Sequence, residues 1–224
     1  MVTSYNKNLI HSICTQIIGD QYSEVNQKES KNRAPFHPFT VDFVTRNMRT
    51  ERFLEIGCGY GQSFDYFPIT DAVEPCSQRR EVSRQKKISV TAGFSEYLPY
   101  ESNMFDTVLM LDTFDQVRSV VETVAEINRV LKLGGVFIFD CQVDDGVDIV
   151  YGLVYGFKNL RRFIEDFGFK GIETRTIQGR GLYCMEKCYD WTPKMLSKLQ
   201  LVKNGENWIA KNFHPEKKFH QYLL

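Results

Sequence analysis

A short apolar strand that runs directly into three alternating glycines is the feature that most constrains the fold of this chain. Residues 53–56 read Phe-Leu-Glu-Ile, and glycines follow at positions 57, 59 and 61. Glycine lets the backbone turn tightly and approach a ligand closely, because it carries no side chain. A helix that starts after such a turn offers free N–H groups. The pattern predicts a nucleotide-like ligand at the carboxyl ends of parallel strands.

From residue 52 onward, short apolar runs alternate with helical stretches. The predicted strands cover residues 53–56, 72–74, 88–92, 106–111 and 136–140, followed by a possible hairpin at 171–177 and 182–187. The predicted helices cover residues 77–86, 117–131 and 158–167, and the Gly134-Gly135 pair is expected to stop the second of them. Such alternation indicates an α/β fold with a parallel sheet covered on both faces, to which a hairpin adds an antiparallel edge.

The segments on either side of this region differ from it. Residues 1–36 carry apolar residues at helical spacing and then a polar stretch, which predicts an N-terminal helical cap. Residues 37–190 hold the predicted core, whose first helix is expected to run from Thr40, as N-cap, to about residue 48. Residues 191–224 are expected to form a C-terminal helix and tail, with a single domain overall.

Composition and charge exclude several classes of protein. The 28 Lys and Arg residues balance 28 Asp and Glu residues, whereas a dedicated nucleic-acid binder usually carries a basic excess. The longest apolar stretch, residues 149–157, is far shorter than the roughly 20 residues of a membrane span, and the N-terminus shows no clear signal peptide. The six cysteines include no C-x-x-C pair, which favours reduced thiols, a cytoplasmic location and no metal site.

The glycine pattern resembles motif I of the Rossmann-like S-adenosylmethionine (SAM)-dependent methyltransferases, of the small-molecule type. A dinucleotide fingerprint would instead place its third glycine at position 62, which is Gln62. Three further segments resemble this family in the expected order, namely residues 93–100 (GFSEYLPY), 105–112 (FDTVLMLD) and 129–138 (RVLKLGGVFI). The resemblance covers about residues 38–190. It implies a seven-stranded sheet, mostly parallel with an antiparallel last strand, and methyl transfer that leaves S-adenosylhomocysteine.

The same resemblance implies which residues bind the cofactor. The glycines would lie under the ribose and methionine parts of SAM, and Glu74 would hold both ribose hydroxyls. Asp112 and Asp115 follow the fourth strand at the mouth of the pocket, and one of them is expected to contact the methionine amino group or the substrate, with a helix-start acid as the alternative. Glu55 would act at the glycine loop, or only cap nearby N–H groups. The expected cofactor-binding set is Glu55, Gly57, Gly59, Gly61, Glu74, Phe94, Ser95 and Asp112.

Two departures from the family pattern affect the predicted site. Phe94 stands where relatives carry an acidic residue for the adenine amino group, so Ser95 or backbone groups are expected to replace it. Gln116 stands where many relatives carry a histidine, and glutamine cannot accept a proton near neutral pH. If the acceptor needs a general base, the N-terminal segment is expected to supply it from His37 or His11.

The acceptor is inferred by elimination to be a small molecule that attacks through oxygen or nitrogen. Tyr151 and Tyr155 are candidates for the substrate pocket, with a core helix as the alternative reading. Basic residues between 79 and 87 leave open a protein or RNA acceptor, and the missing histidine leaves open a non-catalytic SAM-binding partner protein. NAD is disfavoured by Gln62. We expect a monomer or homodimer.

Overall fold

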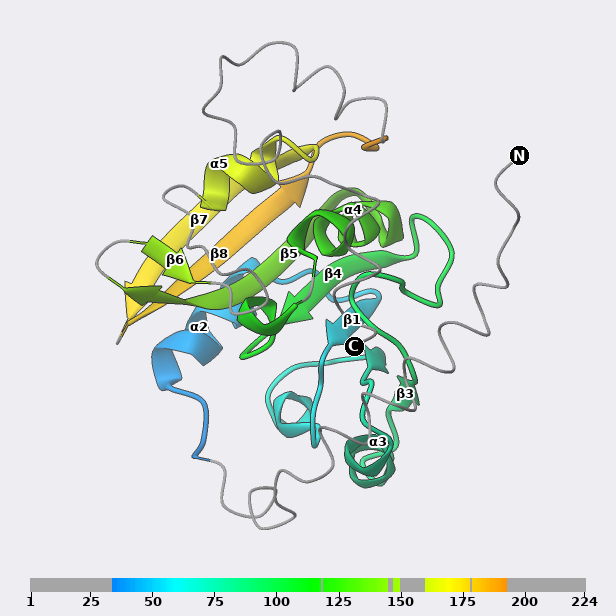
Figure 1. Ribbon diagram of the computed structural model, residues 1–224. Helices are drawn as coiled ribbons and strands as arrows, with labels where there is room; N and C mark the ends of the chain where they lie inside the picture. The colour runs from blue at the N-terminus through cyan, green and yellow to red at the C-terminus, as the bar shows by residue number, and fades with distance from the viewer. Residues whose placement is uncertain (1–33, 118, 145–146, 150–159, 178, 193–224) are drawn as a thin grey trace, which may run out of the picture. The chain divides into compact units, whose positions relative to one another are not determined.

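The computed structural model of the chain describes residues 34–117, 119–144, 147–149, 160–177 and 179–192. Within these ranges one mixed sheet has the strand order β3-β2-β1-β4-β5-β8-β7 (Figure 1). The strands are β1 (Phe53–Ile56), β2 (Asp71–Val73), β3 (Ser89–Thr91), β4 (Phe105–Met110), β5 (Leu131–Asp144), β6 (Val147–Ile149), β7 (Phe169–Ile177) and β8 (Arg180–Lys187). The predicted seven-stranded sheet is confirmed, and the short β6, which pairs with β5, is an addition to it.

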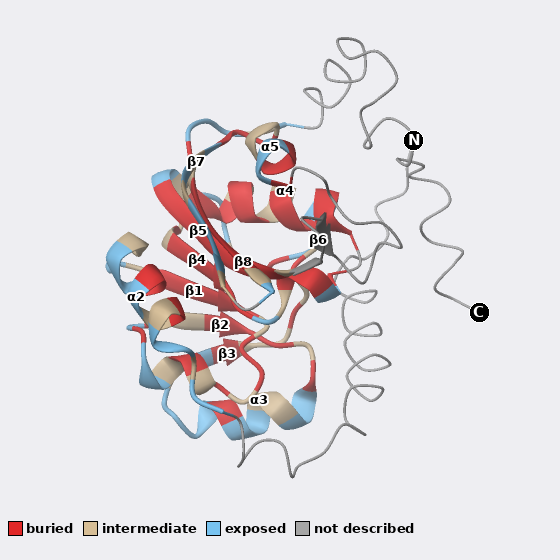
Figure 2. Cartoon of the chain, turned by 90° about the vertical axis from the view of Figure 1, so that its left-hand side faces the viewer, coloured by how far each residue is buried: buried red, intermediate tan, exposed pale blue. Residues whose placement is uncertain are grey.

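Helices and 3-10 turns join these strands. They are α2 (Pro38–Asn47), η2 (Gln62–Asp65), α3 (Ser77–Arg84), η3 (Phe114–Gln116), α4 (Val120–Val130) and α5 (Leu160–Glu165). Helices α2 and α4 both pack against β5 but lie on opposite faces of the sheet (Figure 2). Both faces are therefore covered, as the alternation of strands and helices predicted.

Strand direction brings the ends of several strands to one edge of the sheet. Strand β1 runs parallel to β2 and β4, and β5 runs parallel to β4. Strand β8 is antiparallel to both of its neighbours, which confirms the expected antiparallel strand. Its first residue, Arg180, pairs with Gln142 near the end of β5. The start of β8 therefore lies at the same edge as the carboxyl ends of the parallel strands.

Side chains of β5 divide the core between the two faces, because successive residues of a strand point to opposite sides. Val136 and Ile138 belong to a buried cluster with Phe43 of α2. Phe137 and Phe139 point the other way, and the Phe139 ring lies 4.5 Å from that of Phe114 between centroids. Burying apolar side chains on both faces stabilises the central strands.

The start of α2 differs from the predicted one. The N-cap is His37 rather than Thr40, and Pro38 occupies the first helical turn. The His37 Nδ1 accepts a 3.1 Å hydrogen bond from the backbone N–H of Phe39. Proline fits this position because the first N–H groups of a helix have no partner inside the helix, and its fixed φ suits the helix start.

The end of α4 also differs from the prediction that Gly134-Gly135 stops the helix. The helix ends at Val130, Leu131 already has extended dihedral angles, and both glycines lie inside β5. Their role is to interrupt the pairing of β5 with β4. Leu131 pairs with Phe105 and Val136 with Thr107, so β5 advances five residues where β4 advances two. Gly134 takes a left-handed φ of 77°, which suits such a bulge.

Within the described ranges, no helix has both the length and the apolar character needed to cross a membrane.

Candidate functional site

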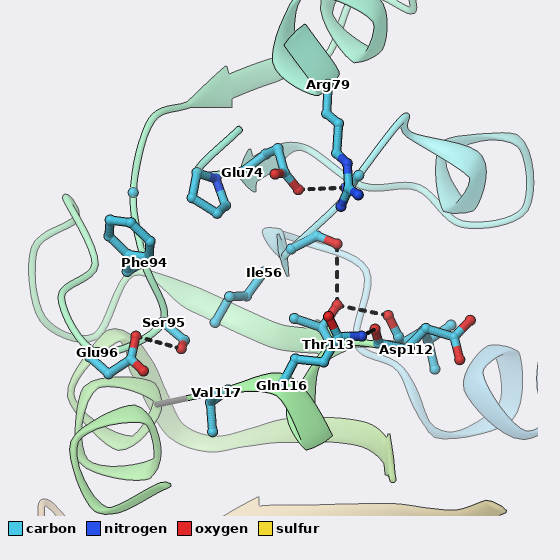
Figure 3. A pocket seen from close by; sticks show the side chains of 15 residues that line it. Ile56, Glu74, Arg79, Phe94, Ser95, Glu96, Asp112, Thr113, Gln116 and Val117 are labelled. Carbon is cyan, nitrogen blue, oxygen red and sulfur yellow. Dashed lines mark hydrogen bonds between the residues drawn. The ribbon is translucent and has the colours of Figure 1, made fainter. Parts of the chain in front are cut away.

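A cavity opens at the carboxyl edge of the sheet, where β1, β2 and β4 end. Figure 3 shows Phe94, Ser95 and Glu96 on one side of it and Asp112 and Thr113 on the other. The glycine turn after β1 and the residues that follow β2 also contribute to its wall. Segments far apart in the sequence therefore converge on the place that the glycine pattern predicted.

The glycine turn fits tightly against the loop after β4. Gly57 has a φ of 74°, and a Cβ there would lie 2.7 Å from the Thr113 Oγ1 and closer still to its methyl group. The Gly57 N–H donates to the carbonyl of Val73 at 2.7 Å, so the turn is also tied to β2. Thr113 in turn donates from Oγ1 to the Leu111 carbonyl at 2.9 Å. Only a residue without a side chain fits here.

Glu74 holds the glycine turn from the end of β2. Its Oε2 accepts a 2.8 Å hydrogen bond from the Gly59 N–H, and its Oε1 accepts a 2.9 Å hydrogen bond from the Cys76 N–H. The side chain is buried yet lines the cavity. Burial raises the pKa of Glu74, and the two N–H donors oppose that rise. A carboxylate has further lone pairs, so it can still accept hydrogen bonds from a ligand.

The far wall of the cavity contains a carboxylate that the sequence analysis missed. Glu96 accepts a 3.0 Å hydrogen bond from the Ser95 hydroxyl and a 3.2 Å hydrogen bond from the Ser119 N–H. Ser95 also shares a 2.9 Å hydrogen bond with the hydroxyl of Thr123. The signal in the sequence was an acidic residue two positions after Phe94, where the family pattern carries one at position 94 itself.

Asp112 stands between this cavity and a second one. It lines both, and its φ of 51° lies in the left-handed region. Its side chain is 49% exposed, and Oδ1 lies 3.2 Å from Nη2 of Arg180. Its carbonyl accepts a 3.0 Å hydrogen bond from Gln116. Asp112 therefore lies where the first cavity meets the second.

The second cavity has a volume of about 410 Å³. Residues 34–37, ahead of α2, form one wall, and Asp140 and Arg180 form another. Gln62 donates from Nε2 to the carbonyl of Ala34 at 2.7 Å, which ties this N-terminal segment to the turn that carries the glycines. The described part of the N-terminal region therefore contacts the sequence motif directly.

Arg180 is surrounded by carboxylates at this edge. Its Nε donates to Asp140 Oδ2 at 2.7 Å, and its Nη2 lies 3.5 Å from Asp115 Oδ2. Burial raises the pKa of Asp140 to about 6, although Arg180 opposes the rise. Burial likewise raises the pKa of Asp115. Burial lowers the pKa of Arg180, but the carboxylates outweigh it and the net shift is upward.

The expected cofactor-binding residues divide into two groups. Gly57, Gly59, Glu74, Phe94, Ser95 and Asp112 line the first cavity. Glu55 accepts a hydrogen bond from the Ser63 hydroxyl at the start of η2, and it is buried behind the glycine turn. Gly61, with a φ of 73°, packs where a Cβ would lie 2.7 Å from the Phe64 ring. These last two residues support the turn in the described structure.

The predicted catalytic and substrate residues are described only in part. His37 lines the second cavity, with its Nδ1 occupied by the Phe39 N–H. In a neutral imidazole this leaves Nε2 carrying the proton. His11, Tyr151 and Tyr155 lie outside the described residues, so their predicted roles stay predictions.

The basic cluster between residues 79 and 87 is largely engaged by the protein itself. Arg80 donates to the carbonyls of Glu74 and Pro75, and Arg84 donates twice to the carbonyl of Val90. Arg79 lines the first cavity, and its guanidinium carbon lies 5.6 Å from the centroid of the Tyr60 ring. The sequence had left these residues open as contacts for a protein or RNA acceptor, and it gave no sign that Arg79 lines the cavity.

Comparison with known proteins finds a family model that matches part of this chain. Residues 54–139 match the family model described as "Methyltransferase domain". The chain is 33% identical over 101 residues to the glycine/sarcosine/dimethylglycine N-methyltransferase of Actinopolyspora halophila, covering 39% of this chain and 18% of that protein. It is 26% identical over 119 residues to an uncharacterized protein of Methanocaldococcus jannaschii, covering 53% of this chain and 58% of that protein. The chain thus spans little more than half of that archaeal relative.

Solved structures share the fold at low sequence identity. A SAM-dependent methyltransferase of Thermotoga maritima, described as a possible histamine N-methyltransferase, superimposes with a TM-score of 0.57 at 18% identity, over 80% of this chain and 99% of that one. A methyltransferase of Haloferax volcanii, solved in complex with the Trm112 activator, gives a TM-score of 0.64 at 16% identity, over 76% of this chain and 98% of that one.

Proposed function

We propose that this chain, which carries a SAM-dependent methyltransferase domain of the Rossmann-like class, transfers a methyl group to an oxygen or nitrogen atom of a small molecule. The observation that carries the proposal is the position of Asp112, which lines two adjoining cavities. One cavity would hold the cofactor and the other the acceptor.

The side chains of the first cavity suit the donors that SAM carries. Its ribose hydroxyls, adenine amino group and methionine amino group are all hydrogen-bond donors, and carboxylates of Glu74, Glu96 and Asp112 line this cavity. The turn at Gly57 and Gly59 adds no side chain to the wall, so a ligand can approach the backbone. This match of donors to acceptors supports SAM as the ligand.

When bound, SAM supplies a sulfonium methyl group, whose carbon–sulfur bond breaks as an acceptor lone pair forms a new bond to that carbon. The protein's task is then to align the acceptor and exclude water. Asp112, at the junction of the cavities, would position the acceptor against the cofactor. The segment 34–37 would cover the acceptor.

A small molecule is favoured over a protein or RNA by the second cavity. Its volume of about 410 Å³ falls within the usual range for small-molecule sites. A nucleic-acid acceptor would need free cationic groups for phosphates, whereas Arg80 and Arg84 are engaged by backbone carbonyls. The activator complex is a finding about the Haloferax volcanii neighbour and not about this chain. For this chain, a cytoplasmic location and a monomeric or homodimeric state stay predictions.

The test begins with calorimetric titration of the purified protein with SAM and with S-adenosylhomocysteine. We expect micromolar binding that weakens when Glu74 is replaced. A screen of small-molecule acceptors with radiolabelled SAM should then show transfer. Binding without transfer to any acceptor class would favour the non-catalytic partner protein. Activity on RNA or protein alone would refute the small-molecule acceptor, and absence of binding to both cofactor forms would refute the proposed function itself.

A further inference from the structure

We propose that the second cavity selects a cationic amine that carries no carboxylate group, and that Asp112 is the residue that recognises its ammonium group. The inference rests on the proposed methyltransferase function and names the class of its acceptor. It is carried by the cavity, by the charges around it and by the partners of Arg180.

Among the described residues, the charged groups around Arg180 leave an excess of negative charge. Three carboxylates, those of Asp112, Asp115 and Asp140, lie within 4 Å of the single guanidinium of Arg180. Even when one of the two buried carboxylates holds a proton, the carboxylates still outnumber the guanidinium. One oxygen of the buried Asp115, Oδ1, has no hydrogen-bond partner among the described residues. A cation that enters the cavity therefore meets an attractive field.

Arg180 is poorly placed to bind an anionic acceptor. Its Nε is held by Asp140 at 2.7 Å, and its Nη2 is shared between Asp112 at 3.2 Å and Asp115 at 3.5 Å. A guanidinium binds a carboxylate best with two parallel N–H groups. Here Nε and Nη2, which form one such pair, already face carboxylates of the protein itself. An acceptor that carries a carboxylate would compete with Asp140 and be repelled by Asp112.

Asp112 differs from the two other carboxylates by its exposure. Its side chain is 49% exposed, whereas those of Asp115 and Asp140 are 5% and 7% exposed. It is therefore the carboxylate that a ligand can reach. It also lines the first cavity, so a nitrogen held by it would lie at the junction with the proposed cofactor site.

The remaining walls suit an organic cation. Phe36, Ile177 and Leu182 line the cavity, and they would contact the apolar part of an amine. Within the described part of the chain, no group of three or more His, Cys, Asp or Glu side chains is arranged to hold a metal ion. An amine with an apolar body matches both the walls and the charge.

Transfer to an amine requires that its nitrogen first lose a proton. The freed lone pair then forms the nitrogen–carbon bond as the carbon–sulfur bond breaks and its electron pair stays on sulfur. The Asp112 carboxylate can take the proton and release it to solvent, since its side chain is half exposed. The methylated ammonium product, S-adenosylhomocysteine and the proton released to solvent then account for all atoms and charges.

Four probes with one phenyl-alkyl skeleton test the selection. 2-Phenylethylamine carries an ammonium group, and 3-phenylpropanoate carries a carboxylate group. Phenylalanine carries both of these charged groups, and 2-phenylethanol carries neither. Each is titrated by calorimetry into the full chain, with and without saturating S-adenosylhomocysteine, and then assayed for methyl transfer. The variants are Asp112→Asn and, as a control on an exposed carboxylate of α2, Asp42→Asn, whose side chain is 67% exposed.

We expect 2-phenylethylamine to bind at least tenfold more tightly than the other three probes. Asp112→Asn should lower the affinity for 2-phenylethylamine about tenfold and change the affinity for 2-phenylethanol by less than twofold. Asp42→Asn should leave both affinities unchanged. The proposal would be overturned if 2-phenylethanol or either carboxylate probe bound as tightly as 2-phenylethylamine, or if no probe bound. It would also be overturned if Asp112→Asn left the affinity for 2-phenylethylamine unchanged. Failure of both SAM and S-adenosylhomocysteine to bind would instead refute the proposed function. The two failures are distinguishable, because the probe titrations without S-adenosylhomocysteine are interpreted separately.

Discussion

Asp112 and Asp140 are joined across two adjacent strands, since the backbone N–H of Asp112 donates a 2.7 Å hydrogen bond to the Oδ1 of the buried Asp140. Arg180 closes a ring by donating to the Oδ2 of Asp140 at 2.7 Å and lying 3.2 Å from the Oδ1 of Asp112. The ring holds Asp112 at a left-handed φ of 51°, a conformation that costs non-glycine residues about 1–2 kcal/mol. It thereby fixes the carboxylate that the two cavities share.

Replacing Arg180 with Met should destabilise the protein by about 3 kcal/mol, because it leaves two buried carboxylates without their cation. Urea unfolding measures the change. The control is Arg175→Met, whose side chain is 56% exposed and pairs with Glu173 on β7, and which should cost less than about 1 kcal/mol. A double variant with Asp140→Asn should recover part of the loss. Similar effects of the two single variants would show that the ring adds no stability.

The stability of the protein should depend on Asp140 between pH 4 and pH 6. The pKa of Asp140 is raised to about 6 by burial, from 3.8 for the unfolded chain, so the native state holds this proton more tightly. This contribution to stability is complete below about pH 4 and is lost as the pH rises to about 6. A shift of this size corresponds to about 3 kcal/mol. The measurement is the free energy of unfolding of the wild type minus that of Asp140→Asn. This difference should decrease as the pH rises from about 4 to about 6. A difference that does not change with pH would refute the raised pKa of Asp140.

Glu74→Ala should weaken the binding of SAM and S-adenosylhomocysteine. It removes a carboxylate that lines the cavity and also frees the Gly59 N–H, and each hydrogen bond to a charged group is worth roughly 1.5–3 kcal/mol. We therefore expect a loss of affinity of at least about tenfold in calorimetry. Glu81→Ala, on the exposed face of α3, is the control and should bind as the wild type does. An unchanged dissociation constant in Glu74→Ala would remove Glu74 from the site.

Gly57→Ala should destabilise the chain more than Gly134→Ala. Both residues have a left-handed φ, of 74° and 77°, so the strain of a side chain at that φ is common to both. Only at Gly57 would the new Cβ collide with Thr113, whereas no atom lies within 4 Å at Gly134. Thermal unfolding should separate the two, and Thr113→Ser should relieve part of the loss in Gly57→Ala. Equal melting temperatures would mean that the loop after β4 moves aside freely.

Two substitutions at His37 separate its cap from its predicted role as a base. His37→Ala removes the cap of α2 and should cost about 0.5–2 kcal/mol, whereas His37→Asn keeps a side-chain acceptor for the Phe39 N–H. If His37 is the base, both variants should slow turnover with little change in SAM affinity. Slower turnover in His37→Ala alone would assign His37 a purely structural role. Rate measurements under saturating SAM distinguish these outcomes.

Local patterns were enough to predict the sheet and the glycine turn. The strand 53–56, its glycines and the alternating elements after it each depend on short-range spacing, and the structure confirms them. The cap of α2 was missed although its signal, Pro38 after His37, stands in the sequence. The helix end at Val130 was missed because a bulge in the pairing of β5 with β4 placed the two glycines inside a strand.

The second cavity could not be predicted from spacing. Its charged wall joins Asp112, Asp140 and Arg180, which lie just after β4, within β5 and at the start of β8. They meet only because β8 runs antiparallel to β5. Each residue alone is an ordinary charged side chain. Glu96 was missed for another reason, since the family pattern drew attention to the position of Phe94. Pairing across a sheet, rather than periodicity along the chain, determines such sites.

The hydrogen bond from Gln62 to the carbonyl of Ala34 links the wall of the second cavity to the residue directly after the glycine turn. A ligand that orders the glycine turn therefore also orders part of the wall that an acceptor would touch. Such linkage makes the two binding equilibria cooperative, and the coupling is reciprocal. The factor by which the nucleoside ligand tightens acceptor binding equals the factor by which the acceptor tightens nucleoside binding. Each ligand would then raise the occupancy of the other's cavity whenever both are present.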